Sequence, residues 1–313
     1  MKVIIMSLMA LLLGCQEQRP VVVGYQLMAN PWKHLIATGK LATVEGKKIE
    51  FKKFNSGAKV VAAMASGDID MAMVGSTPLA AALSQGLDLK LLWVSSIIGE
   101  AEALVVKPEI QSLIDLKGKT IATPFGSTSH YHLLTALKSV GLSNSDLKVL
   151  NLTPSAISAS WQKGDIDGAF VWSPALSELK KNGKVLISSA NLAKQGSPTF
   201  DAFVGRSEFI QNERATAKAL LRKVIDLHGD YNSSQWEAEG DKIKNIAKFV
   251  GITSQETLAT LKGYLYPSKA DHPTDKLPAI LKETSRFLKE QNKISTVLES
   301  YADRVETRLI SEL

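Results

Sequence analysis

The sequence predicts an α/β protein of two lobes, each a mainly parallel sheet flanked by helices, with a C-terminal helical tail. The first observation is that short runs of β-branched residues alternate with helical patterns over the first two thirds of the chain. This alternation is typical of βαβ units, whose strands form parallel sheets. The second observation is an internal repeat, and the third is the length of 313 residues, which is enough for two domains.

The internal repeat places related segments in both lobes. Gly67-Asp68-Ile69-Asp70 returns 97 residues later as Gly164-Asp165-Ile166-Asp167. In each copy a helix end precedes the motif, and a buried strand and a polar turn with a proline follow it, at Pro78 and at Pro174. This spacing is too long for a solenoid repeat and fits two similar lobes.

The elements follow from local patterns. Strands are predicted at residues 21–25, 49–54, 90–94, 103–106, 119–123, 147–152, 184–187 and 201–204. From about Glu208 the apolar spacing becomes helical and predicts helices at 214–227, 242–250, 255–261, 276–291 and 294–309, with a loop at 267–273. The predicted first lobe comprises residues 21–105 and 205–313, including the helical tail, and the second lobe comprises residues 106–204.

The N-terminal segment is typical of an export signal. One lysine precedes an apolar run at residues 3–13, which is too short to cross a bilayer, and Leu12-Leu13-Gly14-Cys15 follows. Because this ending resembles a bacterial lipobox, we predict a lipoprotein signal peptide at 1–14, a lipid on Cys15 and a tether at 15–20. Gln16 favours the outer membrane. The alternative is a hydrophobic N-terminal strand with a chance cysteine. Since Cys15 is the only cysteine, no internal disulfide is possible.

The composition excludes several classes of protein. With 45% hydrophobic and 22% charged residues, the chain is neither disordered, nor collagen-like, nor a multi-span membrane protein. The net charge of +6 is small and spread out, and no basic-aromatic stripe indicates nucleic-acid binding.

Small polar residues follow four predicted strands and point to an anion-binding site. Ligands of open parallel sheets bind beyond the carboxyl ends of the strands, and helix N-termini attract anions. The four strand ends are residues 55–57, 75–78, 126–129 and 153–155, and the candidate residues chosen there are Ser56, Ser76, Thr77, Thr128 and Ser129. Ordinary N-capping would explain any one of these turns equally well.

Two acids and two further side chains occur at the same predicted edge. Glu102 precedes one crossing strand and Asp201 begins the other, so both could pair with an ammonium group. Trp172 stands where the first repeat has Gly75, and it could form a wall of the cleft, contact a cation or simply fill the core. Gln26, at the end of the first strand, is a candidate donor or acceptor.

Catalytic and metal-binding signatures are poor. Gly118-Lys119-Thr120 has the ending of a phosphate loop, but Leu113 stands where its first glycine should be. His130 and His132 are two residues apart on a predicted helix and therefore face different directions. We predict no catalytic residue, no cofactor and no metal.

Seven stretches give the mature chain a resemblance to a known family. They are residues 53–58, 65–68, 75–80, 102–107, 124–131, 161–168 and 171–175. Together they resemble the periplasmic taurine-binding proteins of ATP-driven importers, within the broader aliphatic-sulfonate and nitrate binding group. The likeness runs from about Val21 to Leu313 and is weaker in the helical tail.

The resemblance implies a type II-like periplasmic binding protein that closes like a hinge on its ligand. Such a protein is a monomer, presents the ligand to an ABC permease with its ATPase, and serves sulfur metabolism. On this reading the sulfonate of taurine contacts the five hydroxyl residues, the ammonium contacts Glu102 and Asp201, and Gln26 and Trp172 complete the walls. The alternatives are another alkanesulfonate or nitrate, a sensor, or an enzyme of the thiamine-pyrimidine-synthesis type on the same fold.

Overall fold

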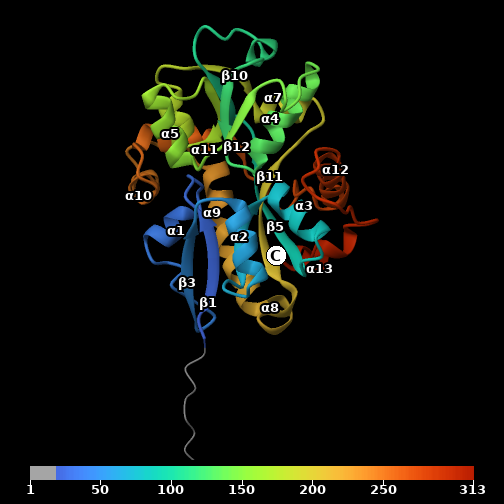
Figure 1. Cartoon of the computed structure of the whole chain (residues 1–313). Coiled ribbons are helices and arrows are strands. Elements are labelled where there is room, and N and C mark those ends of the chain that lie inside the picture. The colour runs from blue at the N-terminus through green and yellow to red at the C-terminus, as the bar shows by residue number, and fades with distance from the viewer. Residues whose placement is uncertain (1–18) are drawn as a thin grey trace, which may run out of the picture.

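The computed structural model describes residues 19–313, which form two lobes stacked one above the other (Figure 1). The predicted signal peptide and Cys15 lie outside the described residues. Of the predicted tether, Arg19 and Pro20 are described, and Arg19 forms an ion pair with the buried Asp70. Within residues 19–313 no helix has the length and apolar character needed to cross a membrane.

The first lobe contains a seven-stranded sheet in the order β12-β5-β11-β4-β1-β3-β2. Its strands are β1 (Val21–Gln26), β2 (Thr43–Val44), β3 (Lys47–Phe54), β4 (Met71–Gly75), β5 (Leu89–Ile98), β11 (Phe200–Arg206) and β12 (Tyr264–Leu265). Strand β1 is parallel to β3 and β4, whereas β11 is antiparallel to β4 and β5. The carboxyl ends of β1, β3 and β4 therefore meet at one edge of the sheet.

The second lobe contains a five-stranded sheet in the order β10-β6-β9-β7-β8. Its strands are β6 (Glu102–Val106), β7 (Thr120–Thr123), β8 (Lys148–Asn151), β9 (Gly168–Trp172) and β10 (Lys184–Ser188). Strand β7 is parallel to β8 and β9, and β6 is antiparallel to β9 and β10. Both sheets are therefore mixed: in each, three neighbouring strands pair in parallel, and the strand where the chain crosses between lobes pairs antiparallel with both of its neighbours.

Helices cover both sheets. Those between the strands are α1 (Lys33–Ala37), α2 (Gly57–Ala65), α3 (Ser76–Ser84), α4 (Thr128–Ser139), α5 (Pro154–Lys163), α6 (Ala175–Leu179) and α7 (Ser189–Lys194). The C-terminal part contributes α8 (Ser207–Asn212), α9 (Arg214–Ser233), α10 (Asp241–Val250), α11 (Ser254–Lys262), α12 (Leu277–Glu290) and α13 (Thr307–Glu312). Helix α12 packs on α3, and α13 packs on β5, so the tail belongs to the first lobe (Figure 1).

The internal repeat corresponds to α2–β4–α3 in the first lobe and α5–β9–α6 in the second. Strand β4 lies between β1 and β11, and β9 lies between β7 and β6. The repeat therefore occupies equivalent positions in two sheets of related topology, and the predicted fold class is confirmed.

The domain boundaries need a small correction. All of β6 pairs within the second sheet from Glu102, and all of β11 pairs within the first sheet from Phe200. The chain therefore crosses at residues 99–101 and 195–199, rather than at 105–106 and 204–205. Both crossing strands are apolar runs, and their composition does not say which sheet they join.

The helix predicted at residues 294–309 is wrong. The structure has a 3₁₀ turn at Ala302–Arg304 and only the short α13 after it. The apolar residues of this segment are held by tertiary contacts: the Tyr301 hydroxyl lies 2.6 Å from the hydroxyl of Ser84, and the Glu306 amide donates to the Leu91 carbonyl at 2.8 Å. These contacts override the helical spacing of the sequence.

Candidate ligand-binding site

Two adjoining cavities lie between the lobes. The outer chamber has a volume of about 130 Å³, and the inner chamber has a volume of about 10 Å³. Gln26 from β1 and Trp172 from β9 line both chambers, so each lobe contributes one of the two shared side chains. An inner volume of this size suits about one water molecule or a group no larger.

The inner chamber forms where the two crossing strands begin. Asp201 of β11 pairs with Gly75 at the end of β4, and Glu102 of β6 pairs with Trp172 at the end of β9. The repeated topology therefore brings one acid from each lobe to the same place. The full lining is Gln26, Met28, Gly57, Gly75, Pro78, Glu102, Ser127, Thr128, Trp172 and Asp201.

The Glu102 carboxyl is buried and only partly satisfied. The Thr128 hydroxyl donates to its Oε1 at 2.7 Å, while Oε2 has no hydrogen-bond partner among the described residues. Burial raises the pKa of Glu102 to about 8, the Asp201 charge adds to this rise, and the neighbouring hydroxyls of Thr128, Ser129 and Ser189 oppose it. Glu102 is therefore ready to accept a hydrogen bond from a cationic donor.

Asp201 is its counterpart from the first lobe. The Ser96 hydroxyl donates to Oδ2 at 3.4 Å. Burial raises the pKa of Asp201 to about 7, against the opposing effects of the Ser96 hydrogen bond and the positive charge of Lys33. Two buried acids in one small chamber favour a cation over an anion.

Lys33, whose charge acts on Asp201, was not predicted. Its amine is fully buried, 3.9 Å from the ring centroid of Trp32 and 4.4 Å from that of Tyr25, and forms no hydrogen bond within residues 19–313. Burial holds the pKa of Lys33 well below its usual value, although the Asp201 charge opposes this. No pattern in the sequence distinguishes a lysine that is buried between two rings from an exposed one.

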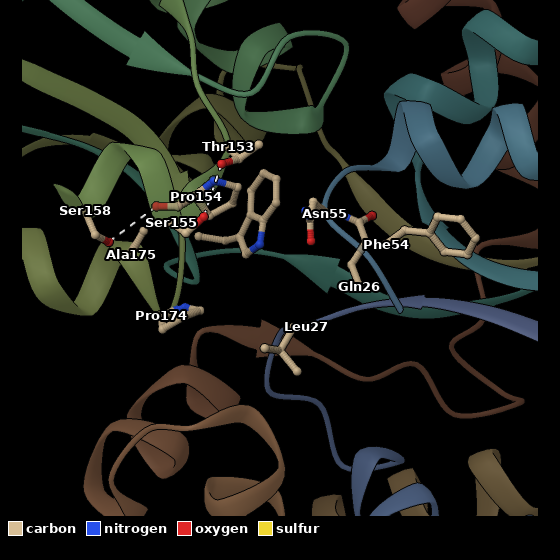
Figure 2. A pocket seen from close by; sticks show the side chains of 11 residues that line it. Gln26, Leu27, Phe54, Asn55, Thr153, Pro154, Ser155, Ser158, Pro174 and Ala175 are labelled. Atoms are coloured by element: carbon tan, nitrogen blue, oxygen red, sulfur yellow. Dashed lines mark hydrogen bonds between the residues drawn. The ribbon is translucent and has the colours of Figure 1, made fainter. Parts of the chain in front are cut away.

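The outer chamber is lined by neutral residues. From the first lobe come Gln26, Leu27, Phe54 and Asn55, and from the second Thr153, Pro154, Ser155, Ser158, Trp172, Pro174 and Ala175. Figure 2 shows Asn55 and Gln26 on one side and Thr153, Pro154 and Ser155 on the other. Thr153 caps α5, and Pro154 occupies its first position, where a backbone N–H is not needed. The polar groups of its lining residues are hydroxyls, amides and the indole N–H of Trp172.

The structure brings together five of the nine predicted site residues. Gln26, Glu102, Thr128, Trp172 and Asp201 line the inner chamber.

The other four predicted residues do not line either chamber. The Ser56 hydroxyl caps α2 by accepting from the Lys59 amide at 3.4 Å, and the Ser76 hydroxyl accepts from the Phe200 amide at 3.3 Å. Thr77 and Ser129 are buried within the first turns of α3 and α4. Of these four, only Ser56 caps a helix, while Ser76 fixes the start of β11 and the Thr77 hydroxyl has no hydrogen-bond partner among the described residues.

Several lining residues were missed although their turns were recognised. Asn55, Thr153 and Ser155 belong to two of the four predicted polar strand ends, yet other residues were chosen. The turn could be found from the sequence, but which side chain of the turn faces the cavity could not. Among residues 19–313 no group of three or more histidines, cysteines or acids is placed to hold a metal.

The architecture defines a class of protein. Two lobes of related topology, joined by crossing strands and enclosing a polar chamber, are those of a two-lobed solute-binding protein. The family profile described as "Substrate binding domain of ABC-type glycine betaine transport system" matches residues 19–244. The chain therefore belongs to this family of ABC-type substrate-binding domains.

Two relatives refine the likeness. The chain is 38% identical over 295 residues to the "Taurine-binding periplasmic protein" of Escherichia coli K12, covering 93% of this chain and 92% of that protein. The crystal structure of the periplasmic aliphatic sulphonate binding protein SsuA from Escherichia coli superimposes with a TM-score of 0.75 at 22% identity, covering 94% of this chain and 99% of that one. The second likeness confirms the periplasmic binding protein fold.

An enzyme shares the fold as well. The crystal structure of the desulfurization enzyme DSZB matches with a TM-score of 0.62 at 14% identity, over 93% of this chain and 98% of that one. The fold alone therefore does not separate binding from catalysis.

Proposed function

We propose that this protein captures taurine between its lobes and delivers it to the permease and ATPase of an ABC importer. The observation that carries the proposal is the pair of buried acids, Glu102 and Asp201, in a chamber about the size of one ammonium group. The 38% identity to a protein named for taurine binding supports the same ligand.

Five residues would form the site around the ligand. Glu102 and Asp201 would accept hydrogen bonds from the ammonium, the Thr128 hydroxyl would hold Glu102 in place, and Trp172 and Gln26 would lie along the ligand. We propose no catalytic role for these residues, because this function needs capture and release without a change in covalent bonds.

Calorimetry with taurine and ethanesulfonate tests this function. Taurine should bind tightly, whereas ethanesulfonate, which lacks the amine, should bind at least about tenfold more weakly, since it leaves two buried acids unpaired. Equal affinity would indicate a general alkanesulfonate-binding protein. Turnover of either compound, detected by mass spectrometry, would indicate an enzyme.

We further propose that the protein works as a lipid-anchored monomer in the periplasm. The support is the lipobox-like Leu12-Leu13-Gly14-Cys15 and the family to which the chain belongs. Metabolic labelling with a radioactive fatty acid should mark the protein, and Cys15→Ser should abolish the label. Release of the unaltered protein into the soluble fraction would contradict the anchor.

A further inference from the structure

We propose that His132 is a positioning residue that fastens the second crossing segment, residues 195–199, to helix α4 and thereby confines the pivot of lobe closure to Pro198. His132 lines neither chamber, so it acts on the ligand only through the movement of the lobes. The inference rests on the proposed function, because it concerns how the lobes close on a captured ligand.

The first argument is that His132 uses both ring nitrogens although it is completely buried. Nε2 lies 2.9 Å from the carbonyl oxygen of Ser197, and Nδ1 lies 2.6 Å from the hydroxyl oxygen of Ser189 in α7. Since a carbonyl oxygen only accepts, Nε2 carries the proton and donates, and Nδ1 accepts from the Ser189 hydroxyl. Burial lowers the pKa of His132 to about 4, although the Ser197 contact opposes this, so the ring is neutral at neutral pH and keeps this tautomer.

The second argument is that the second crossing segment changes lobe at one residue. Ser197 is held by the second lobe on both sides, because its amide donates to the Leu192 carbonyl at 3.0 Å and its carbonyl accepts from His132. Thr199 is held by the first lobe, because its carbonyl accepts from the Ile98 amide of β5 at 3.0 Å. Only Pro198 lies between them, and its ring fixes φ and leaves no N–H. The rotation between the lobes is therefore taken up in the few free dihedral angles around Pro198.

The first crossing segment changes lobe over an equally short distance. The Gly263 carbonyl, between α11 and β12 of the first lobe, accepts from the amides of Gly99 at 3.0 Å and Ala101 at 3.2 Å. A Cβ atom on Gly263 would lie 2.6 Å from the Ala101 nitrogen, so this close approach requires glycine. The next residue, Glu102, already pairs within the second sheet. Both crossings are thus short and well fixed, and a side chain that holds one of them affects the whole hinge.

The third argument is that α4 connects the ligand chamber to this hinge. Thr128 lines the inner chamber, and His132 follows four residues later on the same helix. Residues at this spacing lie on the same face of a helix. Helix α4 also packs against α7, whose Ser189 holds the ring from its other side (Figure 1). A ligand that settles against the start of α4 therefore acts on the Ser197 carbonyl through a short and buried connection.

Loss of the contact between His132 and Ser197 should release the crossing segment from the second lobe. More of the protein would then populate open forms, and the apparent affinity falls with the fraction that is able to close. The chambers themselves would keep their lining residues, so the effect differs from that of a change within the binding site.

His132→Gln and His132→Asn separate the two contacts of the ring. The glutamine amide reaches the position of Nε2 and can donate to the Ser197 carbonyl, whereas the shorter asparagine amide reaches only the position of Nδ1. His132→Asn should weaken taurine about tenfold in calorimetry, mainly through faster dissociation in stopped-flow measurements, and His132→Gln should stay within about threefold of the unaltered protein. Ser139→Ala is the matched control on α4, because its hydroxyl donates to the Ala136 carbonyl of the same helix.

Pro198→Gly tests the pivot without changing the buried ring. Glycine frees φ at this position and should also speed the dissociation of taurine, by about three- to tenfold. Dissociation at the rate of the unaltered protein would place the pivot elsewhere and overturn the inference, even where His132→Asn fails to fold.

Hydrogen exchange on the ligand-free protein tests the Ser197 contact independently of any ligand. Peptides that contain residues 195–199 should exchange faster in His132→Asn than in the unaltered protein and at the unaltered rate in His132→Gln. The inference is overturned if the two variants exchange alike, or if His132→Asn exchanges faster and still binds taurine with unaltered affinity. Absence of taurine binding by the unaltered protein would instead overturn the proposed function, while the exchange rates decide separately whether His132 holds the segment.

Discussion

Each lobe has one buried acid at the start of its crossing strand, and the lobes differ in the residue that pairs with this acid on the neighbouring strand. Asp201 in the first lobe pairs with Gly75, and Glu102 in the second pairs with Trp172, at equivalent positions of the internal repeat. Glycine leaves space at this position, and tryptophan fills it and forms a wall. The two lobes have related topology, but the difference between Gly75 and Trp172 at one position of the repeat makes the chamber asymmetric.

The two acids also differ in their electrostatic surroundings. Asp201 lies close enough to Lys33 for its positive charge to oppose the rise in the Asp201 pKa, which reaches about 7. Glu102 has a hydroxyl partner and a negative neighbour, and its pKa reaches about 8. The second-lobe acid is therefore the one that depends more on an arriving cation, and the predictions below test this difference.

The largest effect is expected from neutralising either acid. Glu102→Gln and Asp201→Asn should each weaken taurine binding by about 1.5–3 kcal/mol, because each removes a charge-assisted hydrogen bond to the ammonium. The loss should be greater for Glu102, which has no cation among the causes of its pKa shift. Calorimetry gives both values, with ethanesulfonate as the ligand that neither substitution should weaken. An equal loss for both ligands would contradict a local role at the amine.

The second effect is a pH dependence of affinity. Since the pKa values of Glu102 and Asp201 are raised to about 8 and about 7, the ligand-free protein holds protons on them at lower pH, and an ammonium must displace those protons. Affinity for taurine should therefore fall as the pH drops below about 8, by about 1.4 kcal/mol per pH unit for each acid that must ionise.

Titrations in buffers of different ionisation enthalpy would detect the released protons directly. Glu102→Gln should shift the onset of this fall towards about pH 7, leaving the Asp201 contribution. The assignment of the ammonium to these acids would be contradicted if the affinity for taurine stayed constant with pH. The range to test extends from about one pH unit above the pKa of Glu102 to about one unit below that of Asp201.

The same comparison separates what the sequence could predict from what it could not. Alternating strands and helices and the repeat Gly-Asp-Ile-Asp indicated the two lobes, and the places of Glu102 and Asp201 at the starts of the two crossing strands led to the acids. The antiparallel crossing strands and the two-residue β2 and β12 could not be predicted, because strand pairing is decided by tertiary contacts.

Site residues on helix starts were harder to choose than site residues on strands. Gln26, Glu102, Trp172 and Asp201 lie on strands whose ends define the inner chamber, and all four line the cavity between the lobes. In the first turn of a helix, one residue faces the cavity while its neighbour caps the helix or enters the core. Thr128 and Ser129 illustrate the difference, since only Thr128 lines the chamber.

The third largest effect on taurine affinity should come from filling the space beside Gly75 in the first lobe. Gly75→Ala should weaken taurine binding by about 1 kcal/mol, because the added carbon lies 3.0 Å from Thr128 Cγ2 and narrows the chamber. Gly229→Ala in α9 is the matched control, because a carbon added there meets no atom within 4 Å. Calorimetry at constant pH measures both, and an affinity of Gly75→Ala equal to that of the control would show that the chamber is not filled by the ligand.

The smallest effect concerns the contacts that hold the lobes together away from the chambers. Helices α4 of the second lobe and α12 of the first meet through the Lys138–Glu290 ion pair at 2.9 Å and through Tyr131 and Phe287, whose ring centroids lie 4.9 Å apart. Lys138 and Glu290 are 62% and 58% exposed in their side chains, so solvent screens the pair. Lys138→Ala should therefore weaken taurine binding by at most about 0.5 kcal/mol, and salt at about 0.5 M should remove the difference from the unaltered protein.

Because this ion pair touches neither chamber, its loss should affect the binding of taurine and ethanesulfonate equally, whereas substitution of the acids should weaken only taurine. A loss for taurine alone would mean that lobe closure and amine recognition are coupled through α4, on which Thr128 also lies.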